Sequence, residues 1–276
     1  MAEQSEAAIH PSAVVEKGAQ LGAGVRVGPF CHVGPDVALE DGVHLHSHVS
    51  ITGHTRIGAR TQVFAHAALG GAPQDWKYKS EPTTLEIGAD CLIRENFTAH
   101  RGTATGRGFT RIGSKCMLMV GAHVAHDCIL GDNIVMANGS LLAGHCEVGD
   151  NVVISGLVAV HQFVRIGRGA MLAGAAGVAG DVLPYTMAQG DRAKLRGLNI
   201  IGLRRSGATR EDVREVRRAL NMLFDRARPA AENVERVRAA HGGNARVAEM
   251  LDFFTNRGKR IFCVPALGHG LDEDGE

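Results

Sequence analysis

The sequence predicts a mainly β fold: a left-handed parallel β-helix of hexapeptide repeats, followed by a small α-helical C-terminal domain. Three observations support this prediction. Aliphatic residues recur at every sixth position over most of the chain before Pro184, glycine supplies 36 of the 276 residues, and helical periodicity replaces the repeat after Pro184. Hexapeptide repeats of this kind are typical of parallel β-helices.

The six-residue repeat runs through two long segments. Eleven of eleven positions are aliphatic from Ile9 to Leu69, and twelve of twelve from Ile112 to Val178. A helix repeats every ~3.6 residues and a strand every ~2, so neither explains a period of six. One short strand followed by a turn does, and glycine supplies the turn conformations that other residues resist. Three hexads form one triangular coil, so residues 18 apart are predicted to be neighbours on successive coils, which stack ~4.8 Å apart.

Two segments interrupt the repeat, residues 71–84, which contain the only tryptophan, and residues 101–110. We expect both to be loops that the β-helix ejects onto one face, where loops tend to carry function. We therefore expect residues 1–190 to form the β-helix with its inserted loops, and residues 191–276 to form the helical domain.

The helical domain is expected to contain three amphipathic helices. Thr209–Asp212 has the form of a capping box and precedes apolar residues at helical spacing, and two further helices are expected near 230–240 and 244–256. Residues 191–271 carry 17 Lys and Arg against nine acids, a net charge of +8, whereas the last five residues contain four acids and are expected to form a disordered tail. The positive charge indicates either solvated helix faces or a basic surface for an acidic partner.

The composition excludes several classes of protein. Thirty Lys and Arg against 29 acids leave a net charge of +1, which argues against binding of nucleic acid. A mean hydropathy of −0.03 and the lack of any apolar run of ~18 residues argue against membrane insertion. The first residues contain no apolar core of a signal peptide and the cysteines form no CxxC pair, so we expect a cytoplasmic protein.

Most of the cysteines fall at the small, inward-facing position of a hexad, so packing is their expected role. These residues are Cys31, Cys91, Cys116, Cys128 and Cys146. Cys128 and Cys146 lie one coil apart, a spacing that a disulfide could span. A reducing cytoplasm disfavours that bond.

A candidate catalytic site emerges when residues 18 apart are compared. Above His126 comes Gly144, above Asp127 comes His145, and a second step from His126 leads to Gln162. A histidine beside a carboxylate is suited to act as a general base, and a glycine N–H can stabilise an oxyanion during acyl transfer. The residues expected to cluster over three coils are His123, His126, Asp127, Gly144, His145, His161 and Gln162. A merely polar edge of the prism is the alternative interpretation.

Two other patterns accompany this cluster. Asn138, Gly156 and Gly174 are each 18 apart, and small residues in a column would leave a groove along the axis that fits an extended chain. His44, His46 and His48, with His66 one coil above His48, could indicate a metal site. Because no carboxylate or thiolate cluster accompanies them, we expect ordinary surface histidines.

The hexads, the segments QDWKY, AHVAHDC, LAGHCEVGD and AVHQF, and the helical C-terminus together resemble the UDP-N-acetylglucosamine 3-O-acyltransferase family, which opens lipid A biosynthesis. The resemblance extends to about residue 260. It implies a homotrimer with active sites between neighbouring β-helices. It also implies transfer of a 3-hydroxyacyl group from acyl carrier protein to the 3-hydroxyl of UDP-N-acetylglucosamine, with no metal or cofactor, and basic helices that face the carrier protein.

The resemblance also implies roles for individual residues. It makes His126 the general base, Asp127 the acid that supports it and Gly144 the oxyanion donor. It implies that Asp75 and Lys77 contact the sugar and phosphates, and that His123 and His145 contact other parts of the substrate. It places Gln162 and His161 near the uridine, and Asn199 and Arg205 at the nucleotide or pantetheine. Gly174 is implied to lie at the end of the acyl chain. The sequence departs from the family at Ser206, which follows Arg204 and Arg205 where a paired arginine is expected, and at Arg192, where members often have histidine.

Three alternatives remain open at this stage. The later acyltransferase of lipid A synthesis, which acts on the glucosamine amine, is expected to carry a uridine-binding domain before the hexads, which here begin at Ile9. A γ-class carbonic anhydrase would hold zinc with three histidines, for which His123, His126 and His145 are candidates, and a zinc assay distinguishes it. A non-catalytic scaffold is the third. The sequence determines neither the length of the acyl chain nor whether the sugar of the nucleotide substrate is GlcNAc or its 3-amino analogue.

Overall fold

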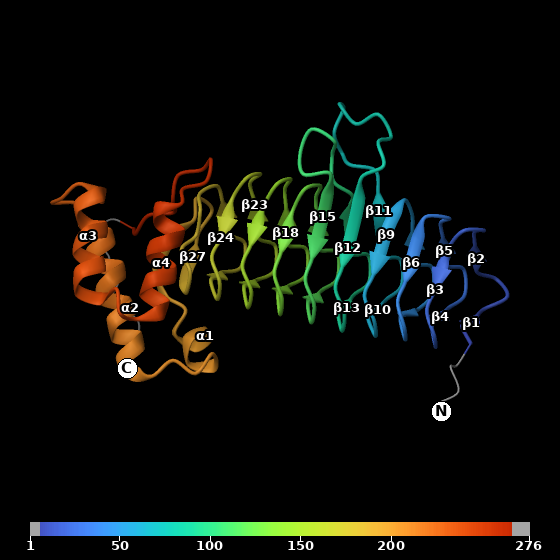
Figure 1. Ribbon diagram of the computed structural model, residues 1–276, viewed down its shortest axis with the longest axis horizontal. Coiled ribbons are helices and arrows are strands. Elements are labelled where there is room, and N and C mark those ends of the chain that lie inside the picture. The colour runs from blue at the N-terminus through green and yellow to red at the C-terminus, as the bar shows by residue number, and fades with distance from the viewer. Residues whose placement is uncertain (1–5, 267–276) are drawn as a thin grey trace.

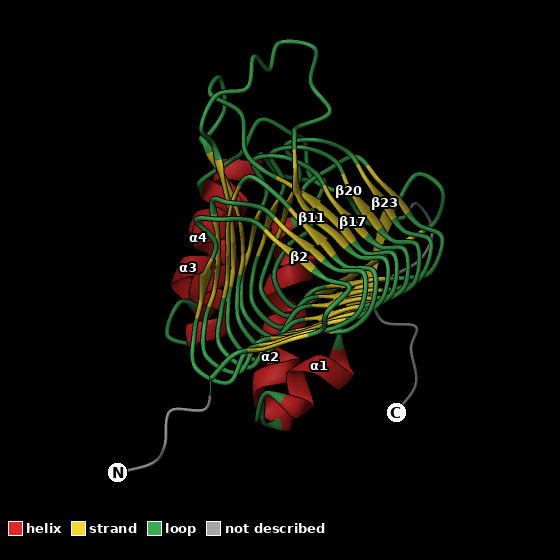
Figure 2. Ribbon diagram, turned by 90° about the vertical axis from the view of Figure 1, so that its right-hand side faces the viewer, coloured by secondary structure: helices red, strands yellow, loops and turns green. Residues whose placement is uncertain are grey.

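The chain winds into a three-sided prism whose faces are parallel β-sheets (Figures 1 and 2). The aliphatic side chains of the hexads are buried inside this prism. This computed structural model describes residues 6–266 of the chain. We name the faces A, B and C in the order in which the chain visits them, and the edges between them AB, BC and CA. The left-handed parallel β-helix and the C-terminal helices predicted from the sequence are confirmed.

Each face is a stack of short strands, one from each coil. Face A contains β1 (Ala8–Ile9), β4 (Arg26–Val27), β7 (His44–Leu45), β10 (Gln62–Val63), β13 (Leu92–Ile93), β16 (Met117–Leu118), β19 (Val135–Met136), β22 (Val153–Ile154), β25 (Met171–Leu172), β27 (Thr186–Gln189) and β28 (Lys194–Leu198). Face B contains β2 (Val14–Val15), β5 (His32–Val33), β8 (Ser50–Ile51), β11 (Ala68–Gly71), β14 (Thr98–His100), β17 (His123–Val124), β20 (Leu141–Leu142), β23 (Ala159–Val160) and β26 (Gly177–Val178). Face C contains β3 (Gln20–Leu21), β6 (Val37–Leu39), β9 (His54–Ile57), β12 (Thr84–Ile87), β15 (Phe109–Ile112), β18 (Ile129–Leu130), β21 (Glu147–Val148) and β24 (Arg165–Ile166).

Strands on one face pair in register with the strand one coil away. Where the repeat is uninterrupted, paired residues are 18 apart, as for His123 and Leu141. The offset rises to 30 between Gln62 and Leu92 and to 25 between Leu92 and Met117, so the two loops add 12 and seven residues to their coils. Both loops leave the prism at the BC edge, between β11 and β12 and between β14 and β15, and project from it together (Figure 1).

The interior of the prism is filled by the hexad aliphatics and by the small residues four positions after them. Ile9, in the first coil, is still 46% exposed, because no described strand pairs with β1 on its outer side. Cys128 and Cys146 are buried and free, in agreement with a packing role. Between the two loops, the buried Ile87, Ile93 and Ala99 fill successive hexad positions, so the repeat continues through this part of the prism.

The helices follow the antiparallel pair β27 and β28, which ends the stack of coils. They are α1 (Ile200–Arg205), α2 (Arg210–Leu223), α3 (Ala230–His241) and α4 (Ala245–Thr255). Thr209 and Asp212 form the expected capping box at the start of α2, and α3 and α4 confirm the two further helices. None of the helices within residues 6–266 is both long and apolar enough to cross a bilayer.

The division of the chain at residue 190 stays a prediction. The last β-strand, β28, ends at Leu198 and the first helix, α1, begins at Ile200. The expected acidic tail, residues 272–276, lies outside the described residues.

The close stacking of coils predicts unequal effects of alanine at two equivalent glycines. A Cβ on Gly28 would lie 2.1 Å from the carbonyl oxygen of His46, whereas a Cβ on Gly34 would lie 3.4 Å from its nearest neighbour, the carbonyl oxygen of Ile51. We expect Gly28→Ala to lower the free energy of unfolding by about 1–3 kcal/mol, the usual cost of overpacking. Gly34→Ala should leave the thermal unfolding midpoint almost unchanged, and equal shifts would contradict the stacking.

Candidate active site

The BC edge places His126 directly against Gly144 of the next coil. A Cβ built on Gly144 would lie 2.6 Å from Cε1 of the His126 ring, so only glycine leaves room for the imidazole here. The N–H of His145 donates to the carbonyl of His126 at 3.0 Å, which holds the two coils in this register. The sequence spacing of 18 therefore predicted this contact correctly.

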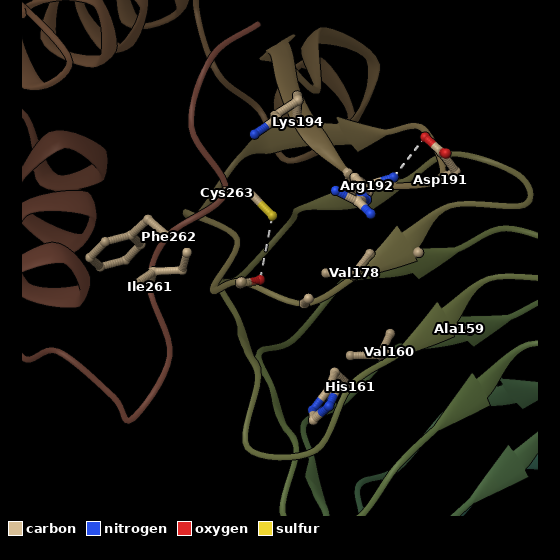
Figure 3. A pocket seen from close by; sticks show the side chains of 14 residues that line it. Ala159, Val160, His161, Val178, Asp191, Arg192, Lys194, Ile261, Phe262 and Cys263 are labelled. Atoms are coloured by element: carbon tan, nitrogen blue, oxygen red, sulfur yellow. Dashed lines mark hydrogen bonds between the residues drawn. The ribbon is translucent and has the colours of Figure 1, made fainter.

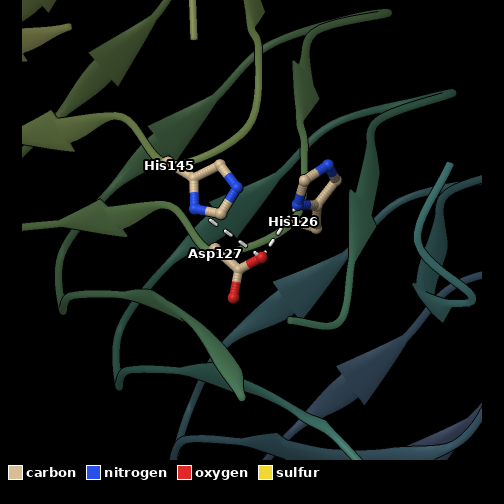
Figure 4. Close-up of side chains that lie close together, drawn as sticks. All are labelled: His126, Asp127 and His145. Carbon is tan, nitrogen blue, oxygen red and sulfur yellow. Dashed lines mark hydrogen bonds and ion pairs between the residues drawn. The ribbon is translucent and has the colours of Figure 1, made fainter. Parts of the chain in front are cut away.

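His126 is paired with a fully buried carboxylate (Figure 4). Its Nδ1 lies 2.8 Å from Oδ2 of Asp127, while Nδ1 of His145 lies 3.8 Å from the same oxygen. Burial opposes the charge of Asp127, but hydrogen bonds from His126, Thr103 and Arg107 outweigh it and hold the pKa of this carboxyl well below its usual range. An ionised Asp127 accepts a hydrogen bond from the Nδ1–H of His126, which leaves Nε2 unprotonated and free to act as a base.

The loop after β14 supplies most of the hydrogen bonds to Asp127. Thr103 donates its hydroxyl at 2.7 Å and its N–H at 3.1 Å, and the N–H of Arg107 donates at 2.7 Å. The Arg107 guanidinium donates to the carbonyl of Asp127 at 2.8 Å and forms an ion pair with Glu147. Sequence reasoning identified the loop but not these residues, because a loop conformation cannot be read from the repeat.

A cavity of about 770 Å³ lies over this edge. The first loop contributes Asp75 and Lys77 to its lining, together with His126, His145 and Gln162 from three successive coils. These five predicted residues are therefore brought together. Lys259, from the segment after α4, also lines the cavity, 4.5 Å from the ring centre of Phe163, and no sequence signal pointed to it.

His123 lies on face B beside this cavity and is neutral at physiological pH. Burial and the nearby His100 lower the pKa of His123 to about 4. The Nδ1 of His123 lies 2.7 Å from Oγ1 of Thr98, and its ring meets the His100 ring edge-on at 5.0 Å. His100 was not identified from the sequence. It follows Ala99 directly, at the end of β14 and just before the second loop. Burial also lowers the pKa of His145, whose ring stacks on Phe163.

His161 does not join the cluster in which the sequence placed it. It lines a separate cavity of about 520 Å³ on face B, with Arg192 and Lys194 among its neighbours (Figure 3). Its ring contacts the guanidinium of Arg260. The reason is positional: His161 directly follows β23 and leaves from face B, whereas Gln162, one residue later, has reached the edge.

The column of small residues occupies the AB edge, and not the edge that carries His126. A Cβ on Gly156 would lie 3.4 Å from the carbonyl oxygen of Asn138, and one on Gly174 would lie 3.7 Å from that of Gly156. The predicted stacking of Asn138, Gly156 and Gly174 is therefore present. It lies two hexads from His126, on another edge of the same protomer, and none of the three lines the cavity of His126.

Asn199 and Arg205 lie together in a third cavity of about 900 Å³, between the CA edge and helices α1 and α4. The side chain of Asn199 is already used within the fold: it caps α1 by accepting from the N–H of Gly202 at 3.0 Å and donates to the carbonyl of Gly169 at 2.9 Å. Ser206 stands where an arginine of the expected pair would be, and its hydroxyl donates to the carbonyl of Leu203.

The structure does not favour a three-histidine zinc site. Among residues 6–266, the group whose ligand atoms lie within 4.8 Å of one another consists of His126, Asp127 and His145, without His123. The Asp127 oxygens already accept hydrogen bonds from the protein. The other histidines of interest form aromatic stacks along face A and the AB edge: His44 on His46 at 4.1 Å between ring centres and His48 on His66 at 4.9 Å.

Comparisons with known proteins agree with this architecture. Residues 18–53 and 109–144 match the family model for the bacterial transferase hexapeptide of six repeats. Residues 181–263 match the model for domain 2 of UDP N-acetylglucosamine O-acyltransferase. The fold and the edge site therefore define a hexapeptide-repeat acyltransferase.

Full-length relatives narrow the class to one family. An acyl-(acyl-carrier-protein)–UDP-N-acetylglucosamine O-acyltransferase of Bartonella henselae is 48% identical over 93% of this chain and 94% of its own length. One of Brucella ovis is 45% identical over 98% and 99%. The crystal structure of a UDP-N-acetylglucosamine O-acyltransferase from Moraxella catarrhalis superposes with a TM-score of 0.89 at 38% identity, covering 92% of this chain and 99% of that one. The chain belongs to the acyl-(acyl-carrier-protein)–UDP-N-acetylglucosamine O-acyltransferase family.

The neutral state of the partly buried His123 predicts a pH dependence of stability. The unfolded chain protonates this histidine near pH 6.5 but the folded chain only near pH 4, so acidification through that window favours unfolding. We expect the free energy of unfolding to fall by about 1 kcal/mol per pH unit from this site. His123→Gln should show a shallower loss between pH 6.5 and 4.5 in thermal denaturation. His54→Gln, at a more exposed ring, serves as the control, and an unchanged slope in His123→Gln would contradict the assignment.

Proposed function

We propose that this chain transfers a 3-hydroxyacyl group from acyl carrier protein to the 3-hydroxyl of UDP-N-acetylglucosamine, the first step of lipid A biosynthesis, with His126 as general base. The observation that carries the proposal is the His126–Asp127 pair seated against Gly144 on the BC edge. The family to which the chain belongs supports the substrates. No metal or cofactor takes part, and the cytoplasm is the proposed location.

In the proposed reaction, Nε2 of His126 removes the proton of the sugar 3-hydroxyl as its oxygen attacks the thioester carbon. The carbonyl oxygen becomes an oxyanion, which the N–H of Gly144 stabilises; within the described residues this N–H has no acceptor. Collapse of the tetrahedral intermediate breaks the carbon–sulfur bond, and the His126 imidazolium returns its proton to the pantetheine thiolate. Base catalysis contributes ~10²–10⁴ in rate and one oxyanion donor about 3–4 kcal/mol.

The cavity residues have proposed roles in holding the nucleotide sugar. Lys77 supplies a positive charge for the phosphates, and Asp75, whose carboxylate accepts from the N–H of Lys77 at 2.9 Å, contacts the sugar. His123, being neutral, offers an uncharged contact to the substrate, as does His145. Gln162 has a proposed role at the uridine side. His161, which was expected to act with it, lines the separate cavity on face B.

We place the complete site between copies in a homotrimer. Face C carries ion pairs such as that of Arg111 with Glu86, as expected for a solvated face. The large apolar side chains exposed on the middle coils lie elsewhere, including Met117 on face A, Leu141 on face B and Leu157 on the AB edge. Packing of face A on face B of a neighbour would set the CA edge of one copy beside the BC edge, and therefore the His126, of another. Asn199 and Arg205, at the CA edge, would then reach the nucleotide or pantetheine from the neighbouring copy. The AB edges, with their columns of small residues, would meet at the inner side of the same interface.

The same arrangement assigns the acyl chain and the carrier protein. Gly174 leaves the upper part of the column open, which favours a long acyl chain. Helix α2 presents Arg210, Arg214 and Arg218 at its surface, and Arg204 precedes it on α1. These positive charges suit an acidic carrier protein, whose encounter they would accelerate.

Removal of the base tests the reaction directly. We expect His126→Ala to reduce turnover by ~10²–10⁴ with acyl carrier protein thioester and UDP-N-acetylglucosamine, since Nε2 is then lost. Circular dichroism and size-exclusion chromatography should show an unchanged fold and oligomer, and His54→Ala serves as the histidine control. Wild-type turnover in His126→Ala would rule out the mechanism.

Mixed oligomers test whether the site is shared. His126→Ala removes the base and Arg205→Glu reverses the charge that a neighbour would present to the nucleotide or pantetheine, so each variant alone should have little activity. In a co-refolded equal mixture, about a quarter of the interfaces would pair an intact base with an intact Arg205 from a neighbour, as for any heterologous contact. Recovery to that extent is expected. A mixture that stays inactive would place His126 and Arg205 of one site in the same protomer.

A further inference from the structure

The loop between β14 and β15 encloses the carboxylate of Asp127. Three protein donors reach it in addition to His126: the hydroxyl and N–H of Thr103 and the N–H of Arg107. Asp127 is fully buried and Thr103 is 2% exposed. With so many fixed donors, the plane of the carboxylate has one arrangement in which Oδ2 faces Nδ1 of His126.

The loop also approaches the carboxylate more closely than a side chain would allow. A Cβ on Gly106 would lie 2.5 Å from Cγ and from both oxygens of Asp127. The loop is held in this position by its own turn, in which the N–H groups of Gly106 and Gly108 donate to the carbonyl of Thr103. The Arg107 guanidinium ties it to the coil through the carbonyl of Asp127 and through Glu147.

We propose that Thr103 is a positioning residue for the general base, acting on His126 through Asp127. This inference rests on the proposed function of His126. Thr103 does not line the cavity, whereas Arg107 does, so Thr103 holds the carboxylate without meeting substrate. It keeps Asp127 oriented and ionised, and Asp127 in turn fixes the tautomer of His126. Other charged or titratable groups lie near the pair: His145, Arg107 and Glu147, with His100 and His123 beside His126, and Asp75, Lys77, Arg165 and Lys259 in the lining of the cavity.

The test replaces the Thr103 hydroxyl while keeping its shape. We expect Thr103→Val to lower kcat by about 10- to 100-fold with little change in KM, because a misaligned base slows chemistry without weakening binding. Thr103→Ser, which restores the donor, should recover most of the activity. Thr61→Val, which removes an equally buried hydroxyl that donates to the carbonyl of Gly88, is the matched control and should retain kcat.

A double-mutant cycle separates positioning from a general structural role. If Thr103 acts through Asp127, then adding Thr103→Val to the Asp127→Asn variant should lower kcat almost no further. Multiplied losses in the double variant, or a raised KM with unchanged kcat in the single one, would overturn the proposal. Either result leaves the His126→Ala test of the reaction unaffected.

A second variant covers the case in which Thr103→Val does not fold. Gly106→Ala pushes a methyl group against Asp127 and should also lower kcat, whereas Gly243→Ala, with nothing within 4 Å of its Cβ, should not. Because Gly106 itself lines the cavity, this comparison rests on kcat alone. Full activity in Gly106→Ala would contradict the close grip of the loop on the carboxylate.

Discussion

The structure depends on in-register hydrogen bonding between coils 18 residues apart. A two-residue strand has no stability of its own, so each gains its order from the strands above and below it. The same ladder continues through the edges, where the N–H of Phe163 donates to the carbonyl of Gly144 and that of His145 to the carbonyl of His126. The geometry of the proposed site therefore follows from the stacking itself: the ring of His126 rests on Gly144 because the backbone holds their coils at a fixed spacing.

Each edge of the prism carries a different set of residues. The BC edge carries the carboxylate, the histidines and both loops, the AB edge carries the column of small residues, and the CA edge meets the helices around Asn199. The three sets of residues therefore lie on three different edges of one protomer. Lateral association of prisms, as proposed above, is the arrangement in which parallel edges of different copies meet along their length.

Much of the fold and part of the site could be predicted because the repeat converts sequence spacing into distance. The contact of His126 with Gly144 and the column ending at Gly174 follow from that rule alone. Thr103 could not be predicted in this way, because its loop departs from the repeat and its conformation depends on local turns. Lys259 lies about a hundred residues after Phe163 in the sequence, and it reaches the cavity because the chain after α4 packs beside that ring. His161 was misplaced because a rotation of one residue at a corner changes the face toward which a side chain points.

The two ends of the β-helix are not equivalent. At the C-terminal end, β27 and β28 turn antiparallel and the helices cover the last coil. At the other end, β1, β2 and β3 each pair with a strand on one side only within the described chain, and Ile9 remains half open to water. Loss of order in such a stack is directional: it begins where a coil has a single neighbour and advances one coil at a time. His126, Asp127 and Gly144 lie several coils inward, so the molecule can fray at its open end while these three residues keep their alignment.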